Sequence, residues 1–205
     1  NYSFKFYGHK VFLDDVVRLQ DNGFLSSQMV DGLINSTRED DIRAATEIVS
    51  IQYDKQNRPV FCINPSQYGM NASNASAQFD LTVVMGDTLP QLIRQECTMG
   101  LVMNDNNLHW YLLVLYFRNE GTTVEVQIRD SHASISVQKH SRHVKNVFAT
   151  IINTYNLHVE AIPSCIHEQH TQPTFESAKV RMQTENECGI EVASNWTTVL
   201  ANLEV

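Results

Sequence analysis

The chain has 205 residues, and hydrophobic residues make up 42% of them, which is enough to build the core of one domain. It carries 23 Asp and Glu residues against 15 Lys and Arg residues, so its formal net charge at pH 7 is -8. A nucleic-acid-binding protein would show a basic footprint, so we exclude that class of partner. The acidic surface either keeps the domain soluble or steers it toward a basic protein partner.

The cysteines indicate a reducing compartment, because none lies in a CxxC pair and a chain of this length needs no disulfide framework. There are four of them: Cys62, Cys97, Cys165 and Cys188. The N-terminus carries no signal peptide and no apolar run is long enough to cross a bilayer, so we predict a cytoplasmic protein with no membrane partner. The chain begins at Asn1 instead of Met, and we therefore expect residues 1–205 to be a single domain from a longer protein.

The front of the chain predicts a mainly helical lobe. A short strand at 11–13 precedes a helical turn over 16–19. Ser26 or Ser27 caps a second helix, and apolar residues at helical spacing predict a third helix from residue 39 to about Tyr53.

The rest of the chain predicts a sheet with helices beside it. The run at 109–117 is so apolar that we expect a strand buried on both faces. The turn at 119–121 then leads into an antiparallel neighbour at 122–129. The other predicted elements are strands at 59–63, 81–85, 101–103, 157–162 and 178–183, and helices at 89–95, 137–155 and 188–203. The predicted fold class is α+β, with a central mixed sheet flanked by helices.

Cys188 is the first candidate for chemistry, because it begins the last predicted helix after a polar turn at 184–186. The unpaired N–H groups and the dipole of a helix start stabilise a thiolate, which is the attacking species in acyl transfer. From its position alone, Cys188 is either such a nucleophile or a buried, inert cysteine. For the other three cysteines we favour the inert interpretation.

His109 and Asp130 are the second candidate, because they lie at the outer ends of two strands joined by a tight turn. Antiparallel pairing brings those ends together, which lets a carboxylate orient an imidazole and stabilise its charged form. Each residue alone would be interpreted as an ordinary polar residue at a strand end. His167 and His170 lie near Cys165, but no fourth ligand is evident, so we expect no metal and no cofactor.

Four segments resemble motifs of the Ulp/SENP-type cysteine proteases. Residues 108–115, Leu-His-Trp-Tyr-Leu-Leu-Val-Leu, resemble their His-Trp strand, and Arg-Asp-Ser at 129–131 resembles their Asp-Ser strand end. Gln-Thr-Glu-Asn-Glu-Cys-Gly at 183–189 resembles their Gln-…-Asp-Cys-Gly segment. Residues 16–27 look like a divergent copy of their entry motif, with Phe24 in place of the usual Trp. The order His, Asp, Gln, Cys is also theirs, and it differs from the Cys-first order of papain-like enzymes.

The resemblance implies a papain-like architecture of the Ulp type and a cysteine isopeptidase that cleaves after a Gly-Gly tail. His109 would be the general base, Asp130 its orienting partner and Cys188 the nucleophile. Gln183 would form the oxyanion hole together with the backbone N–H of Cys188. The residues implied to contact the modifier tail are Trp110, which would cover it, Phe24 and Gly189.

Ubiquitin is the modifier that we favour, with a SUMO- or NEDD-type modifier as the alternative. Gln183 lies five residues before Cys188, where SUMO proteases commonly have six, and Glu187 replaces their usual Asp. Divergent members of the Ulp/SENP-type group that this chain resembles, including bacterial effectors, often cleave ubiquitin. An effector origin would place this chain in the cytosol of a host cell.

Two other function classes remain open on the same scaffold. One is an acyltransferase like the YopJ group, which typically has Glu at the acid position and a basic pocket, whereas this chain has Asp130 and few basic residues near its end. The other is an inactive ubiquitin-binding module, against which the complete set of candidate catalytic residues argues.

Overall fold

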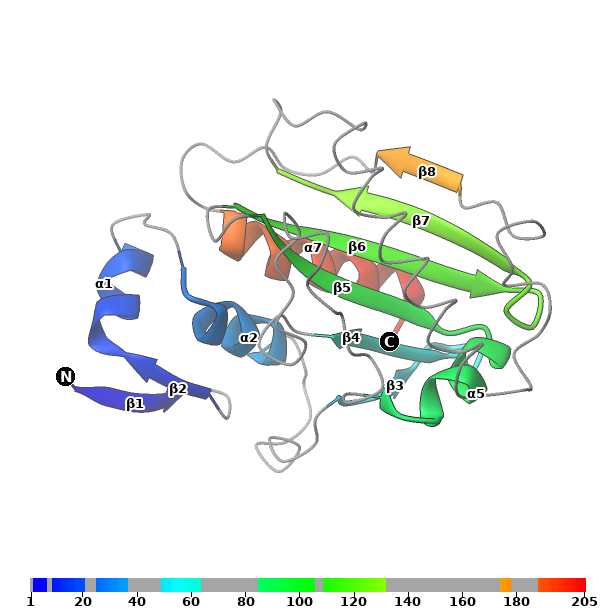
Figure 1. The fold of residues 1–205 in the computed structure, drawn as a ribbon, viewed down its shortest axis with the longest axis horizontal. Coiled ribbons are helices and arrows are strands. Elements are labelled where there is room, and N and C mark those ends of the chain that lie inside the picture. The colour runs from blue at the N-terminus through cyan, green and yellow to red at the C-terminus, as the bar shows by residue number, and fades with distance from the viewer. Residues whose placement is uncertain are drawn as a thin grey trace.

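The structure, a computed structural model, has the α+β fold that the sequence predicts (Figure 1). It describes residues 2–6, 9–20, 25–36, 49–63, 85–105, 109–131, 174–177 and 188–205. Within these residues, six strands form one sheet, in the spatial order β3 (Gln52–Tyr53), β4 (Pro59–Ile63), β5 (Thr98–Asp105), β6 (His109–Arg118), β7 (Thr123–Arg129) and β8 (Thr174–Ser177). The pairs β4–β5 and β7–β8 are parallel and the others are antiparallel, so the sheet is mixed.

The central strand β6 is buried on both faces, as its apolar run predicts. Its odd-numbered residues from 111 to 117 pack in a core that includes α5 (Thr88–Arg94). Its even-numbered residues from 110 to 114 pack in a second core with α2 (Ser27–Ser36) and α7 (Cys188–Leu203). Helix α7 therefore runs along one face of the sheet, and this placement fixes the position of its first residue, Cys188 (Figure 1).

Gly100 on β5 lets α7 approach the sheet closely. A Cβ at this position would lie 2.7 Å from the Trp196 ring and 3.0 Å from the Cys62 sulfur. We expect Gly100→Ala to lower the free energy of unfolding by about 1–3 kcal/mol, because the added methyl overpacks this core. Chemical denaturation measures the change, and an unchanged stability would mean that α7 does not pack this tightly on β5.

The N-terminal lobe contains a hairpin that the sequence analysis did not predict. Strands β1 (Ser3–Phe6) and β2 (His9–Phe12) pair antiparallel, where we expected one short strand, and α1 (Leu13–Gln20) follows. The cap predicted for the second helix is confirmed, since the Met29 N–H donates to the Ser26 hydroxyl oxygen at 3.3 Å. Helix α2 packs between this lobe and α7.

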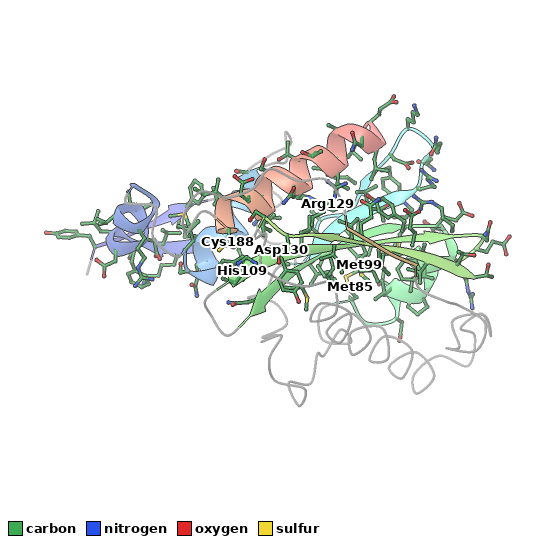
Figure 2. The ribbon with its side chains drawn as sticks, turned by 90° about the horizontal axis from the view of Figure 1, so that it is seen from above. Met85, Met99, His109, Arg129, Asp130 and Cys188 are labelled. Atoms are coloured by element: carbon green, nitrogen blue, oxygen red, sulfur yellow. The ribbon has the colours of Figure 1, made fainter. Side chains whose placement is uncertain are left out.

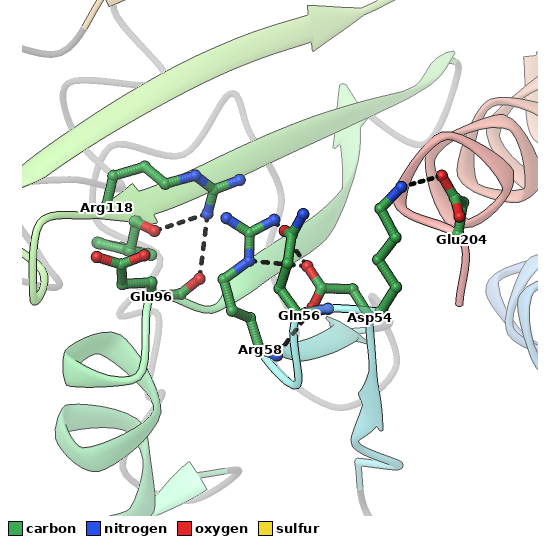
Figure 3. Close-up of polar contacts among 8 residues, drawn as sticks. Asp54, Gln56, Arg58, Glu96, Arg118 and Glu204 are labelled. Carbon is green, nitrogen blue, oxygen red and sulfur yellow. Dashed lines mark hydrogen bonds and ion pairs between the residues drawn. The ribbon is translucent and has the colours of Figure 1, made fainter.

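The helix predicted to reach Tyr53 is wrong at its end, because Tyr53 belongs to strand β3. A tight turn centred on Asp54 explains the difference (Figure 3). The Asp54 carboxylate accepts the backbone N–H groups of Gln56 and Arg58 at 2.9 and 2.8 Å, and Asn57 adopts a φ of 60°. This turn joins β3 to β4 as an antiparallel pair, so Gln52 and Tyr53 are extended in spite of the helical spacing of the apolar residues before them.

The strand predicted at 81–85 does not include Met85, which has helical backbone. Gly86 follows with a φ of 49°, the left-handed conformation that commonly ends a helix. Other predictions fall outside the described residues: the helix at 137–155, the strands at 157–162 and 178–183, and most of the third helix. Among the described helices, none has the length and apolar character that crossing a bilayer would require.

Candidate active site

His109 and Asp130 meet at one end of the sheet, as the antiparallel pairing of β6 and β7 predicts. The His109 Nε2 atom lies 2.8 Å from the Asp130 Oδ1 atom, and the two side chains are 11% and 9% exposed. The imidazole N–H donates to the carboxylate, so the carboxylate fixes both the orientation of the ring and its tautomer. A partly buried pair of this kind stabilises the protonated imidazole.

The turn between β6 and β7 sets the register that makes this contact possible. Asn119, Glu120 and Gly121 have φ values of 53°, 57° and 82°, which is the left-handed region. At Gly121 a side chain would also clash, because a Cβ would lie 2.4 Å from the Ile93 side chain. The register that follows from the turn begins at the Leu112–Arg129 pair, immediately before Asp130.

Cys188 is the first residue of α7, as predicted, and its side chain reaches His109 (Figure 2). Burial lowers the pKa of His109, but hydrogen bonds to Asp130 and Cys188 and the charges of both groups raise this pKa to about 9. Because Nε2 faces Asp130, Nδ1 is the ring nitrogen left for the thiol. The three side chains therefore form a linear array of acid, base and nucleophile with the polarity of a catalytic triad.

The raised pKa of His109 predicts the alkaline limit of any chemistry at this site. The protonated ring is needed to stabilise the Cys188 thiolate and to give a proton to the leaving group. Below about pH 9 the imidazole is protonated, and above it the proton is lost. We expect kcat/KM to fall as the pH rises through about 9, which a pH–rate profile measures. A fall centred near 6.5, the ordinary pKa of His, would show that the two contacts do not act on the ring.

Tyr111 and Arg129 are neighbours of the site that the sequence analysis did not single out. The Tyr111 ring stacks on the His109 ring, with centroids 6.2 Å apart and an interplanar angle of 20°. Arg129 is buried and donates from Nη2 to the Gln127 side-chain oxygen at 3.0 Å. Strand alternation gave a signal for Tyr111, since it lies two residues after His109 and on the same face.

Of the residues implied to contact the modifier tail, the structure describes Trp110 and Gly189. Trp110 is 3% exposed and lies in the core with α2 and α7, and its indole N–H donates to the Leu25 carbonyl at 3.3 Å. Gly189 faces Leu25 as well. Phe24 and Gln183 lie outside the described residues. The structure therefore places Trp110 in the core, and its contact with a modifier tail stays a prediction.

The other cysteines that the structure describes are buried away from His109. Burial raises the pKa of the Cys97 thiol far above its ordinary value, so this thiol stays protonated. Cys62 packs against Gly100 in the same core as α7. Within the described ranges no group of three or more metal-ligating side chains occurs, and the predicted absence of a site at Cys165 falls on residues that are not described.

No protein-family model matches this chain, and no curated protein matches its sequence. Solved structures do match its fold. A de-sumoylating protease is 15% identical, with a TM-score of 0.64 over 97% of this chain and 72% of its own. The C-terminal Ulp1 protease domain, in complex with the yeast SUMO orthologue Smt3, is 12% identical, with a TM-score of 0.59 over 100% and 80%.

A third match is the effector protein XopD of Xanthomonas campestris, bound to ubiquitin. It is 17% identical, with a TM-score of 0.52 over 88% of this chain and 76% of its own. At these identities the comparisons establish the fold and leave the activity to be argued from the site. The chain therefore has the fold of the Ulp-type cysteine proteases, as its motifs predicted.

Proposed function

We propose that this chain is a cysteine isopeptidase that cleaves after the C-terminal Gly-Gly of ubiquitin. One observation carries the proposal: the His109 ring bonds to Asp130 at 2.8 Å and reaches Cys188 with its other side. A buried imidazole held between a carboxylate and a thiol at a helix start is the arrangement that activates a thiolate. The fold shared with SUMO and ubiquitin-like-protein proteases supports the same reaction class.

The reaction would run through a thioester. The Cys188 thiolate attacks the carbonyl carbon of the terminal glycine, and the imidazolium of His109 gives its proton to the lysine amine that leaves. Water then loses one proton to His109 and attacks the thioester carbonyl, which releases the carboxylic acid and the Cys188 thiolate. The acid loses its proton to solvent, and the thiolate stands again beside a protonated His109. Asp130 holds the ring in position and stabilises its charge in both steps.

Gln183 completes the proposed site as an oxyanion donor, together with the backbone N–H of Cys188. We expect Gln183→Ala to lower kcat by about 10²–10³-fold with little change in KM, because the donor acts on charge that develops in the transition state. Steady-state kinetics measure both constants. A rise in KM with an unchanged kcat would instead make Gln183 a substrate-binding residue.

The burial of Cys188 supports a substrate whose C-terminal residues lack bulky side chains. Cys188 is 1% exposed, so a tail with bulky side chains would meet the surrounding protein before it reached the sulfur. A Gly-Gly tail presents the least bulk. We propose that Phe24 contacts this tail, whereas a contact with Trp110 or Gly189 would require Leu25 to move, since Leu25 lies next to both.

Ubiquitin is proposed over SUMO because of the spacing from Gln183 to Cys188 and because of Glu187. XopD, with a similar fold, was solved bound to ubiquitin. SUMO deconjugation is the second candidate, since two of the matching structures are a de-sumoylating protease and a complex with a SUMO orthologue. We also propose a single catalytic domain working in the cytosol, which the reduced state of Cys62, Cys97 and Cys188 supports.

Fluorogenic C-terminal conjugates of ubiquitin, SUMO and a NEDD-type modifier test this choice. We expect the ubiquitin conjugate to be hydrolysed fastest. Changing its penultimate glycine to alanine should nearly stop cleavage, because the added methyl must enter a buried site. Faster hydrolysis of the SUMO conjugate would favour the second candidate. Equal rates on the glycine and alanine forms would contradict a site that requires a slender tail.

A further inference from the structure

Within the described residues, the ladders that join β6 to β5 and to β7 begin at different points of β6. The ladder with β7 begins at the Leu112–Arg129 pair, whereas the ladder with β5 continues to the Asp105–His109 pair. The backbone of β5 holds His109 at the start of β6. A catalytic base needs its geometry held within a fraction of an ångström, and the side chain next to it on the strand contributes to this.

Trp110 is the residue next to His109 on β6. Its indole N–H donates to the backbone carbonyl of Leu25 at 3.3 Å, and both residues are buried. Leu25 lies just before the Ser26 cap of α2. The bond thus joins the start of β6 to the start of α2, across 85 residues of sequence.

Leu25 continues the connection to the start of α7. A Cβ built on Gly189 would lie 3.1 Å from the Leu25 Cδ1 atom and 3.1 Å from the Val30 Cγ2 atom. The absence of a side chain at Gly189 therefore lets Leu25 pack directly against the residue that follows Cys188. Trp110, Leu25 and Cys188 belong to one continuous core.

We propose that Trp110 is a positioning residue that sets the distance between the imidazole of His109 and the sulfur of Cys188. It acts through the indole bond to Leu25 and the packing of Leu25 on Gly189. The inference rests on the proposed function only in that these two groups form a reactive pair. It assigns Trp110 a role that is independent of any modifier tail.

Trp110→Phe tests this role, because it keeps a ring in the core and removes the N–H. The matched control is Trp196→Phe, which alters the other tryptophan of the same core, packed on Gly100 away from His109. Site-resolved mass spectrometry follows alkylation of Cys188 by iodoacetamide at pH 6 and at pH 9.5. The rate at pH 6 divided by the rate at pH 9.5 reports how far the imidazolium stabilises the thiolate. A change in access to the sulfur alters both rates alike and therefore cancels from this ratio.

We expect Trp110→Phe to lower this ratio by about tenfold, or about 1.4 kcal/mol, because a misplaced imidazolium stabilises the thiolate less. Trp196→Phe should leave the ratio near wild type. Leu25→Ala should lower the ratio too, because it removes the packing of the Leu25 side chain on Gly189 and keeps the backbone carbonyl that accepts the indole N–H. Melting temperatures show whether each variant is folded at the assay temperature. The Leu25 variant also keeps the test open if Trp110→Phe does not fold.

Two outcomes would overturn the proposal. In the first, folded Trp110→Phe and Leu25→Ala both keep the wild-type ratio, and Trp110→Phe instead raises KM for the ubiquitin conjugate, which would make Trp110 a substrate contact. In the second, Trp196→Phe lowers the ratio as much as Trp110→Phe, which would mean a general effect of the core. Failure of the proposed function would be seen in the wild-type protein itself, where Cys188 would show the same low ratio as Cys62.

Discussion

Replacing Cys188 by alanine is expected to lower kcat by about 10⁵–10⁶-fold, because the sulfur is the atom that bonds to the substrate carbonyl. The change removes one buried atom at the start of α7, so the fold and the binding of the modifier should persist. Hydrolysis of a ubiquitin conjugate measures the loss, and titration of the variant with labelled ubiquitin measures the binding.

Cys62→Ala is the matched control for this variant. Cys62 is a buried cysteine in the same core as Cys188, and it lies on β4 against Gly100. We expect it to keep its activity per folded molecule, with a lower stability at most. Residual hydrolysis by Cys188→Ala near the wild-type rate would contradict the assignment of the nucleophile.

Asp130→Asn is the second large effect, with an expected fall in kcat/KM of about 10²–10⁴-fold. An amide keeps the shape of the carboxylate but loses the charge that stabilises the imidazolium. The hydrogen bond and the charge of Asp130 both raise the pKa of His109 toward about 9. The alkaline limb of the pH–rate profile should therefore move down from about 9 toward the ordinary value of 6.5.

Asp54→Asn separates this effect from a general loss of a buried carboxylate. Asp54 bonds to Arg58 at the opposite end of the sheet, and Arg58 holds the pKa of its carboxyl below the ordinary value in spite of burial (Figure 3). Losing that charge should weaken the turn and leave the pH–rate profile in place. A limb that stays near pH 9 in Asp130→Asn would contradict the role of Asp130.

The sheet and the meeting of His109 and Asp130 at one end of it could be predicted because the sequence signals for both are local. The apolar run of β6, the turn at 119–121 and the antiparallel return of β7 determine which residues end opposite each other. The closeness of His109 and Asp130 follows from that register, and the 2.8 Å contact confirms it. The start of α7 at Cys188 was equally visible, since a polar turn precedes an apolar helix.

The links between distant segments could not be predicted from the sequence. The bond from Trp110 to Leu25 depends on how α2 packs against α7, which no local pattern encodes. The family resemblance implied that Trp110 covers the modifier tail, and no local pattern indicated its bond to Leu25. Strand β1 was missed because it has four residues and the first three of them are exposed.

Reaction with a ubiquitin probe that carries a C-terminal propargyl group tests the central claim most directly. The probe forms a covalent bond only with a thiolate that the ubiquitin tail has reached, and peptide mapping then identifies the modified residue. We expect one adduct, on Cys188, which is absent from Cys188→Ala and retained in Cys62→Ala. An adduct on another cysteine, or no adduct on the folded wild-type chain with ubiquitin, SUMO or NEDD-type probes, would contradict it.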